Sequence, residues 1–288
     1  MNAEIRIVVR DIKAAARIGH AESLWLALDG LLELPQAAGN RQLSAAFLRD
    51  AVLPAGQALA HPRLEAALVK SLGKAPHAVV RAVCGAGLAY RYFDNEDVKR
   101  KDLLRLARDD RRDVRQSLAL ALIEAAGDQQ ERLLDLLHTW IADPSPRVQI
   151  VAMALVSVFP EKAVEILSQL TPGGEREIRA AMAEALNLAA NSGRSDEVLE
   201  LLASWAQEGE NYVWVICKTL SSSWAAERVQ ETLAILKQLV GDASAEKQVK
   251  KVLKAMVRHG AGDAMQQELE GYSDSGERKL INLYQEIE

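Results

Sequence analysis

A similar helix start recurs along the chain, and this recurrence constrains the fold more than any other feature of the sequence. Aligned on one apolar position, the starts fall at Val80, Val114, Val148, Ile178, Val213, Val249 and Leu280. The intervals between them are 34, 34, 30, 35, 36 and 31 residues. A period of about 20–50 residues is typical of units that bury their apolar faces by stacking on one another. The sequence therefore predicts an array of repeated units.

Apolar residues follow a helical spacing within these segments. Val114, Leu118 and Leu122 lie at i, i+4 and i+8, which places them on one face of a helix. Residues of the AVILMFWYC set make up 49% of the chain but aromatics only 5%, so most apolar side chains are Ala, Leu and Val. Small aliphatic side chains of this kind favour closely packed helices. We expect an all-α protein.

Each unit is predicted to be a pair of helices, and the whole chain, 1–288, to be one repeat domain. Residues 62–288 would form about seven pairs: 62–73 with 77–92, 99–108 with 112–126, 129–142 with 146–159, 161–170 with 175–190, 195–207 with 211–224, 227–240 with 245–259 and 262–271 with 275–287. Residues 1–60 fit less well and are predicted to be an irregular helical cap. Helices are expected there over Ala21–Leu34 and Arg41–Ala60, the second kinked or broken by Pro54.

The turns before the second helices carry the form D-x-x-x-R-V-x-x-x-A. It is seen as Asp143 through Ala152 and, in part, as Asp109 through Arg115. This form resembles the HEAT repeat, and the resemblance covers roughly residues 62–288. It implies antiparallel helix pairs stacked in a right-handed α-solenoid, whose concave face usually holds a protein partner and in some members nucleic acid. It identifies a fold rather than an activity.

The residue after the repeated apolar position forms a row, here named the ladder. Its members are Arg81, Arg115, Gln149, Arg179, Trp214 and Lys250. Because four of the six are basic, the ladder is a candidate surface for phosphates or an acidic peptide. The alternative is structural: the arginines would pair with turn aspartates, such as Asp109, Asp110 or Asp143, of their own or a neighbouring unit.

Trp214 interrupts the basic ladder. Tyr212 and Lys218 lie near it in the sequence, and the three form an aromatic and basic cluster that is predicted to face the groove. Trp and Tyr beside a basic residue are typical of binding hot spots. The alternative is that Trp214 is packed in the interface between units. Trp205 and Trp224 are expected to be core residues.

The net charge of −5 argues against bulk attraction to nucleic acid or to an anionic membrane. Residues 1–150 hold 21 Lys and Arg against 19 Asp and Glu, and residues 151–288 hold 14 against 21. The segment Lys99–Arg115, with eight basic and four acidic residues, is a further candidate contact for an acidic partner. No apolar run is long enough for a secretory signal or a membrane span. We expect a cytoplasmic protein with buried, reduced Cys84 and Cys217.

Motifs of known catalytic chemistry are missing from the sequence. The five histidines are dispersed, and there is no H-E-x-x-H, C-x-x-C, G-x-S-x-G, Walker loop or dinucleotide fingerprint. The sequence accordingly predicts no catalytic residue, no metal ligand and no cofactor.

The leading hypothesis is a non-enzymatic HEAT-repeat adaptor that binds a protein or peptide in its concave groove. Its predicted partner-binding residues are Arg81, Arg115, Arg179, Tyr212, Trp214, Lys218 and Lys250. The alternative is a DNA-binding protein similar to the bacterial alkylpurine DNA glycosylases, which are built from HEAT-like helix pairs. That resemblance implies a Trp and Asp pair at the lesion, for which Trp140 and Asp143 are the candidates. A regulatory subunit is a third possibility that the residues do not distinguish from an adaptor.

Overall fold

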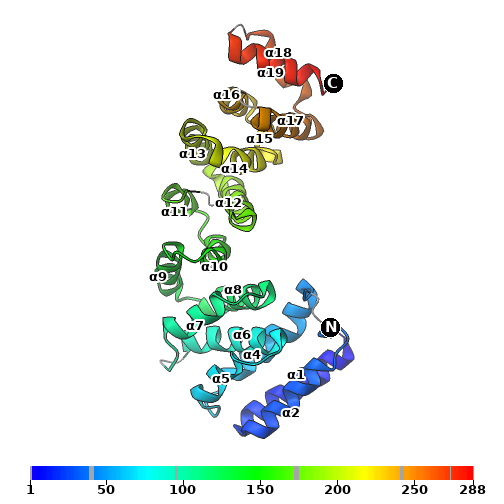
Figure 1. Cartoon of the computed structure of the whole chain (residues 1–288), viewed down its shortest axis with the longest axis vertical. Coiled ribbons are helices and arrows are strands. Elements are labelled where there is room, and N and C mark those ends of the chain that lie inside the picture. The colour runs from blue at the N-terminus through cyan, green and yellow to red at the C-terminus, as the bar shows by residue number, and fades with distance from the viewer. Residues whose placement is uncertain are drawn as a thin grey trace. The chain divides into compact units, whose positions relative to one another are not determined.

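The structure is a computed structural model, and it describes residues 2–38, 42–94, 97–171, 175–240, 243–272 and 274–287. Over these residues the protein is all-helical, with no strand (Figure 1). The chain divides into two compact units, Met1–Leu155 and Val156–Glu288. Many packed helices over a core of Leu, Val, Ile and Ala agree with the all-α prediction.

The first unit contains ten α-helices among the described residues, and α10 ends one residue beyond its boundary. They are α1 (Ala3–Ile18), α2 (Ala21–Leu32), α3 (Ala45–Phe47), α4 (Leu53–Leu59), α5 (Ala66–Leu72), α6 (Ala78–Asp94), α7 (Arg100–Ala107), α8 (Arg112–Ala126), α9 (Gln130–Ile141) and α10 (Pro146–Val156). A π-helical segment, η1 (Leu48–Val52), joins α3 to α4.

The second unit continues the alternation of helices and short turns. Its helices are α11 (Ala163–Ser168), α12 (Arg176–Ala189), α13 (Ser195–Glu208), α14 (Glu210–Leu220), α15 (Ser223–Ala226), α16 (Val229–Leu239), α17 (Ala243–Arg258), α18 (Gly262–Glu270) and α19 (Ser275–Gln285). Between α12 and α13 the segment η2 (Ala190–Arg194) has non-helical dihedral angles at Ser192 and Gly193, so the chain turns there.

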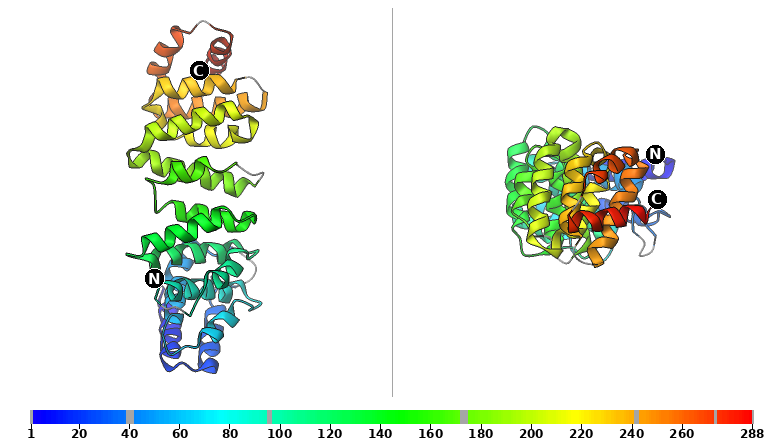
Figure 2. Two further views of the ribbon diagram at one scale, coloured as in Figure 1. Left: turned by 90° about the vertical axis from the view of Figure 1, so that its left-hand side faces the viewer. Right: turned by 90° about the horizontal axis from the view of Figure 1, so that it is seen from above.

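Helices that are two places apart in the sequence, or three where the short helix α15 intervenes, pack on one another and form rows. In the first unit α4 packs on α6, and α6 packs on α8. In the second unit α12, α14, α17 and α19 form one row, and α11, α13, α16 and α18 form another. The yellow to orange helices of the second unit show this side-by-side packing (Figure 1, Figure 2).

Close backbone approach between α4 and α6 requires glycine on both helices. A Cβ added at Gly56 would lie 2.3 Å from the Cβ of Ala86, and one added at Gly87 would lie 2.7 Å from the Cβ of Leu59. These distances are far below van der Waals contact, so the two helices pack at a separation that no side chain at Gly56 or Gly87 would allow.

The N-terminal region differs from the sequence prediction, because α1 was not expected. Its apolar stripe, Ile5, Val9 and Ile12, is buried. Asn2 caps the helix by accepting a hydrogen bond from the N–H of Glu4, and Gly19 ends it with a φ of 78°. The i, i+4, i+7 spacing of these residues is present in the sequence and is sufficient to predict this helix.

Pro54 interrupts its helix in a milder way than expected. The helical path continues from α3 through η1 to α4, while Arg41, the expected start, lies outside the described residues. In a regular α-helix the proline ring would clash with the carbonyl four residues earlier. The π-helical turn, in which the N–H of Leu53 bonds to the carbonyl of Leu48, takes up one extra residue immediately before the proline.

The helix register of α14 corrects the alignment made from the sequence. The repeated apolar residue is the third of its helix in α8, α10 and α12, and in α14 the third residue is Tyr212. Tyr212 is buried, whereas Val213 is only half-buried. Tyr212 is therefore the residue of α14 that matches Val114, Val148 and Ile178. The ladder position of α14 is then Val213, and Trp214 lies one residue beyond it. Sequence spacing alone does not distinguish a buried aromatic side chain from one that is exposed on the surface.

Candidate functional site

The ladder residues of the first unit hold the turns that precede their own helices. Each donates a side-chain hydrogen bond to a main-chain carbonyl five or six residues earlier. The pairs are Arg81 to Ala75 (3.0 Å) and Pro76 (3.0 Å), Arg115 to Asp109 (2.9 Å) and Asp110 (3.1 Å), and Gln149 to Asp143 (3.0 Å). Carbonyls in such turns have no helical partner, so these contacts satisfy acceptors that would otherwise depend on water. Gln149 makes the same contact as the arginines without their charge.

Arg81 also makes a bidentate ion pair with Asp109, which lies in the turn between α7 and α8. Its Nε lies 2.8 Å from Asp109 Oδ2 and its Nη2 lies 3.1 Å from Asp109 Oδ1. Burial raises the pKa of the Asp109 carboxyl, but Arg81 and the N–H of Arg111 stabilise the carboxylate and hold its pKa below the usual value. For Arg81 the structure thus shows the pairing with a turn aspartate that the sequence offered as the alternative to binding.

Exposure separates the ladder residues. Arg115 is only 6% exposed, so a partner could reach its guanidinium only if the turn at Asp109 and Asp110 opened. Lys250 is half-buried and forms an ion pair with Glu286. Gln149 and Arg179 are half-buried as well.

The pair proposed for the glycosylase alternative serves packing and turn formation. Trp140 is 1% exposed within α9. Asp143 accepts hydrogen bonds from the N–H of Ser145 at 2.9 Å and from Arg108 Nη2 at 3.0 Å. A buried indole cannot stack on a base, and a carboxylate that closes its own turn has fewer free acceptor sites for a substrate.

The aromatic cluster of the second unit is divided between core and surface. Tyr212 is buried and stacks on Trp205, with ring centroids 5.0 Å apart, so it does not face a groove as expected. Trp224 is buried and donates from Nε1 to Asn187 Oδ1 at 2.8 Å. The expectation that Trp205 and Trp224 belong to the core is confirmed.

Trp214 remains at the surface in contact with a neighbouring helix. It is half-buried on α14, and the guanidinium of Arg179 on α12 lies 5.8 Å from its ring centroid. This distance is within the range of a cation–π contact. Lys218, one helical turn further along α14, is exposed. The structure therefore brings together Arg179, Trp214 and Lys218, and it separates Tyr212 from them.

A second basic group, not singled out from the sequence, lies on α17. The side chains of Lys247, Lys251, Lys254 and Arg258 are all exposed. Their spacing of i, i+4, i+7 and i+11 places them on one face, opposite the buried residues Val249 and Val252. We call these four residues the α17 stripe. The spacing of these four residues is present in the sequence, but the ladder includes only their neighbour Lys250.

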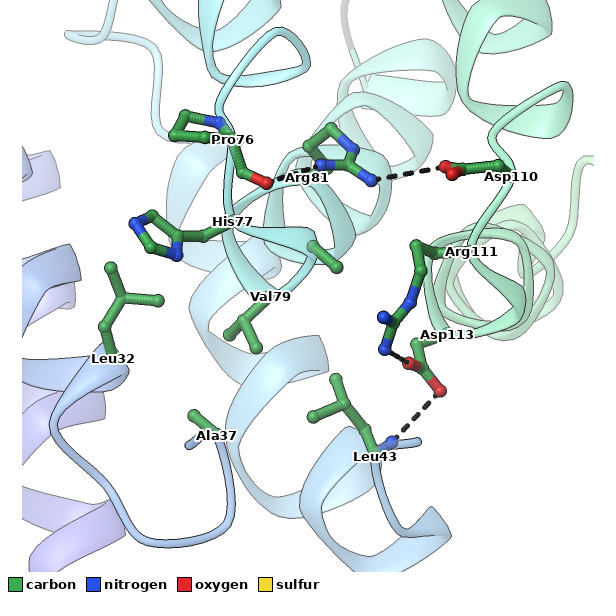
Figure 3. A pocket seen from close by; sticks show the side chains of 11 residues that line it. Leu32, Ala37, Leu43, Pro76, His77, Val79, Arg81, Asp110, Arg111 and Asp113 are labelled. Carbon is green, nitrogen blue, oxygen red and sulfur yellow. Dashed lines mark hydrogen bonds and ion pairs between the residues drawn. The ribbon is translucent and has the colours of Figure 1, made fainter. Parts of the chain in front are cut away.

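A polar pocket of about 370 Å³ lies in the first unit, between the segment after α2 and the N-terminal ends of α6 and α8 (Figure 3). Leu32, Leu43, His77, Arg81 and Asp113 are among its lining residues, with His77 near Leu32 and Asp113 near Leu43. Its charged groups already have protein partners. Asp113 accepts from the N–H of Leu43 at 3.1 Å and from Arg111, and Arg81 binds the aspartates of the next turn.

The remaining chemistry of the described residues is unremarkable for a packed helical protein. Burial raises the pKa of the Cys84 and Cys217 thiols to about 12, with nearby cations acting weakly in the opposite direction. No three His, Cys, Asp or Glu side chains come together as a metal site within the described ranges. None of the helices searched there combines the length and the hydropathy that a membrane crossing requires.

No family model matches the chain, and no curated protein matches it. Among solved structures, the chain is similar to the crystal structure of an engineered protein determined by a structural genomics consortium. The two are 15% identical, the alignment covers 100% of this chain and 99% of that one, and the TM-score is 0.33. At that TM-score the similarity carries no argument about fold or function.

Proposed function

We propose that this chain is a HEAT-like, right-handed α-solenoid of antiparallel helix pairs. The turn contacts of Arg81, Arg115 and Gln149 support the proposal. Each of these side chains, on α6, α8 and α10 respectively, donates a hydrogen bond to the main-chain carbonyl six residues earlier. The helix rows within each unit support it as well, since stacked units bury their faces against neighbours.

We propose further that it works in the cytoplasm as a non-enzymatic adaptor that binds a protein or peptide partner. The observation that carries this proposal is the contact between Arg179 and Trp214 at the surface of the second unit. Trp and Arg are the residues most enriched in binding hot spots, and both supply large contact areas. Lys218 adds an exposed cation one turn away.

The test is affinity capture of partners by the wild-type protein and by Trp214→Ala, with and without nuclease, identified by mass spectrometry. The affinity of the purified partner is then measured directly. Loss of a hot-spot tryptophan should weaken binding by about thirtyfold, which corresponds to about 2 kcal/mol. Trp25→Ala is the matched control, because Trp25 is 38% exposed on α2 and has no assigned role.

The two variants separate the outcomes. Partner binding that resists nuclease, is lost with Trp214→Ala and is kept with Trp25→Ala supports the adaptor. Equal binding by both variants contradicts the assigned site. Recovery that disappears with nuclease contradicts a protein partner and favours nucleic acid. Thermal melting by circular dichroism shows whether Trp214→Ala is folded, and Trp214→Phe, which retains an aromatic ring there, serves if it is not.

A further inference from the structure

The α17 stripe is a line of cations about 16 Å long, since its eleven-residue span rises about 1.5 Å per residue. Lys251 Nζ donates to Gln248 Oε1 at 3.2 Å, and Arg258 Nε donates to the carbonyl of Lys254 at 3.2 Å. Both acceptors are neutral. Within the described part of the chain, none of the four stripe residues has a carboxylate partner.

Other lysines of the same unit are neutralised. Lys237 forms ion pairs with Asp274 and Glu277, and Lys250 pairs with Glu286. The unit has enough carboxylates to pair every cation, because residues 156–288 contain 21 Asp and Glu against 14 Lys and Arg. Among the described residues, none of these carboxylates forms an ion pair with the α17 stripe.

The charge of the second unit is thereby segregated. Helix α17 holds five of the 14 basic residues and one of the 21 acidic residues. The rest of the unit is left with nine basic and 20 acidic residues. The stripe is a positive strip on a negative unit, and such an arrangement attracts an anion of limited width.

The helix that carries the α17 stripe is a neighbour of α14, the helix that carries Trp214 and Lys218. Helices α14 and α17 pack on each other (Figure 1). The charge of Lys251 acts on the Cys217 thiol of α14, where it lowers a pKa that burial raises more strongly. Lys218 follows Cys217 in the chain, and Trp214 lies one turn before Lys218 on the same side of the helix.

We infer that the α14–α17 surface, formed by Trp214, Lys218 and the α17 stripe, binds an acidic segment of a partner protein. The four cations of the stripe match the carboxylates of about five extended residues, which span about 16 Å. Trp214, at the edge of the surface, supplies an apolar anchor for a side chain next to the acidic residues. This inference rests on the proposed adaptor function and specifies the chemistry of its partner.

Nucleic acid fits the same surface less well. A DNA duplex carries one charge per about 1.7 Å of its axis and is wider than one helix. A strand longer than the α17 stripe would extend onto the rest of the unit, which has 20 acidic and nine basic residues. A short acidic peptide, by contrast, need not extend beyond the cations of the α17 stripe.

The experiment uses fluorescence anisotropy of a labelled oligoglutamate peptide with the full chain, at low salt and in about 0.5 M NaCl. An oligoglutamine peptide and a single-stranded oligonucleotide are the comparison probes. The variant is Lys247→Glu with Lys251→Glu. The matched control is Lys13→Glu with Arg17→Glu, which makes the same change of charge at the same spacing on the exposed side of α1, a helix of equal length.

Exposed ion pairs change affinity by about 1.5- to fivefold each. Reversing two cations is expected to weaken oligoglutamate binding by about tenfold or more, while the control changes it little. Binding should fall at high salt, and oligoglutamine should not bind. An equal loss in both variants, no loss in either, or tighter binding of the oligonucleotide than of oligoglutamate would overturn the inference.

The outcome is separable from that of the adaptor proposal. If oligoglutamate does not bind but a nuclease-resistant partner is still lost with Trp214→Ala, the adaptor stands and the acidic-segment inference fails. If oligoglutamate binds through Lys247 and Lys251 but no partner depends on Trp214, the charge chemistry stands and the hot-spot assignment fails.

Discussion

Replacing Arg81 by alanine decides whether the ladder arginines are structural or binding residues. The substitution removes the bidentate contact with Asp109 and the two hydrogen bonds to the carbonyls of Ala75 and Pro76. It leaves the carboxylate of Asp109 with its contact to the N–H of Arg111 but without its cation. The turn before α6 and the turn before α8 thereby lose the contacts that Arg81 makes with both of them.

The magnitude follows from the burial of the pair. The side chains of Arg81 and Asp109 are 15% and 9% exposed. Removing one partner of a fully buried ion pair costs about 3–5 kcal/mol, and exposed pairs contribute about 0–1 kcal/mol. For this mostly buried pair we expect Arg81→Ala to lower the free energy of unfolding by about 2–4 kcal/mol.

Urea unfolding followed by circular dichroism measures this loss. With a slope of about 2 kcal/mol per molar urea, the midpoint should fall by about 1–2 M. Hydrogen exchange should locate the loss at the amides of α6 and α8. The control is Lys218→Ala, since Lys218 is exposed on α14, and its effect should stay within about 0.5 kcal/mol.

The pH dependence gives a second check. A carboxyl with a lowered folded-state pKa stabilises the protein above its unfolded pKa, about 3.9, and the stabilisation is lost as the pH falls through the folded value. The difference between wild type and Arg81→Ala should therefore shrink in acid below about pH 3.9. An unchanged midpoint combined with loss of partner binding would refute the structural role of Arg81.

Two further predictions concern the core. Gly87→Ala should destabilise the first unit by about 1–2 kcal/mol, because its Cβ would lie 2.7 Å from the Cβ of Leu59. Gly85→Ala, on the same helix with its nearest contact at 3.6 Å, should instead stabilise it by about 0.5–1 kcal/mol, and urea midpoints of opposite sign would verify the pair. The buried Cys84 and Cys217 thiols, with pKa values of about 12, should resist a thiol reagent at about pH 8 until the chain unfolds; rapid labelling of the native protein would contradict this.

Local periodicity was sufficient to predict most helices after residue 62. The expected second helix at 112–126 is α8 with the same bounds, and its residues Val114, Leu118 and Leu122 are buried. Turn signals placed the helix starts correctly at Pro146 and near Arg176. Such features depend on residues within one or two turns of each other, so the sequence contains them directly.

Contacts between distant residues were not predictable in the same way. The ion pair of Arg81 with Asp109 joins residues 28 positions apart, and Asp109, Asp110 and Asp143 were equal candidates in the sequence. The alignment on Val213 failed because burial of Tyr212 against Trp205 depends on how α13 packs on α14.

The sequence by itself determined an all-α chain, because helical spacing and turn residues act locally along the backbone. Only the tertiary structure decided which polar side chains are free to meet a partner. The side chains of Arg81 and Arg115 bond to the turns that precede their helices, and Trp214 lies beside Arg179. Lys250 pairs with Glu286, whereas Lys251 is exposed. The physical reason is that desolvation and ion pairing depend on neighbours contributed by other helices, which no spacing within one helix specifies.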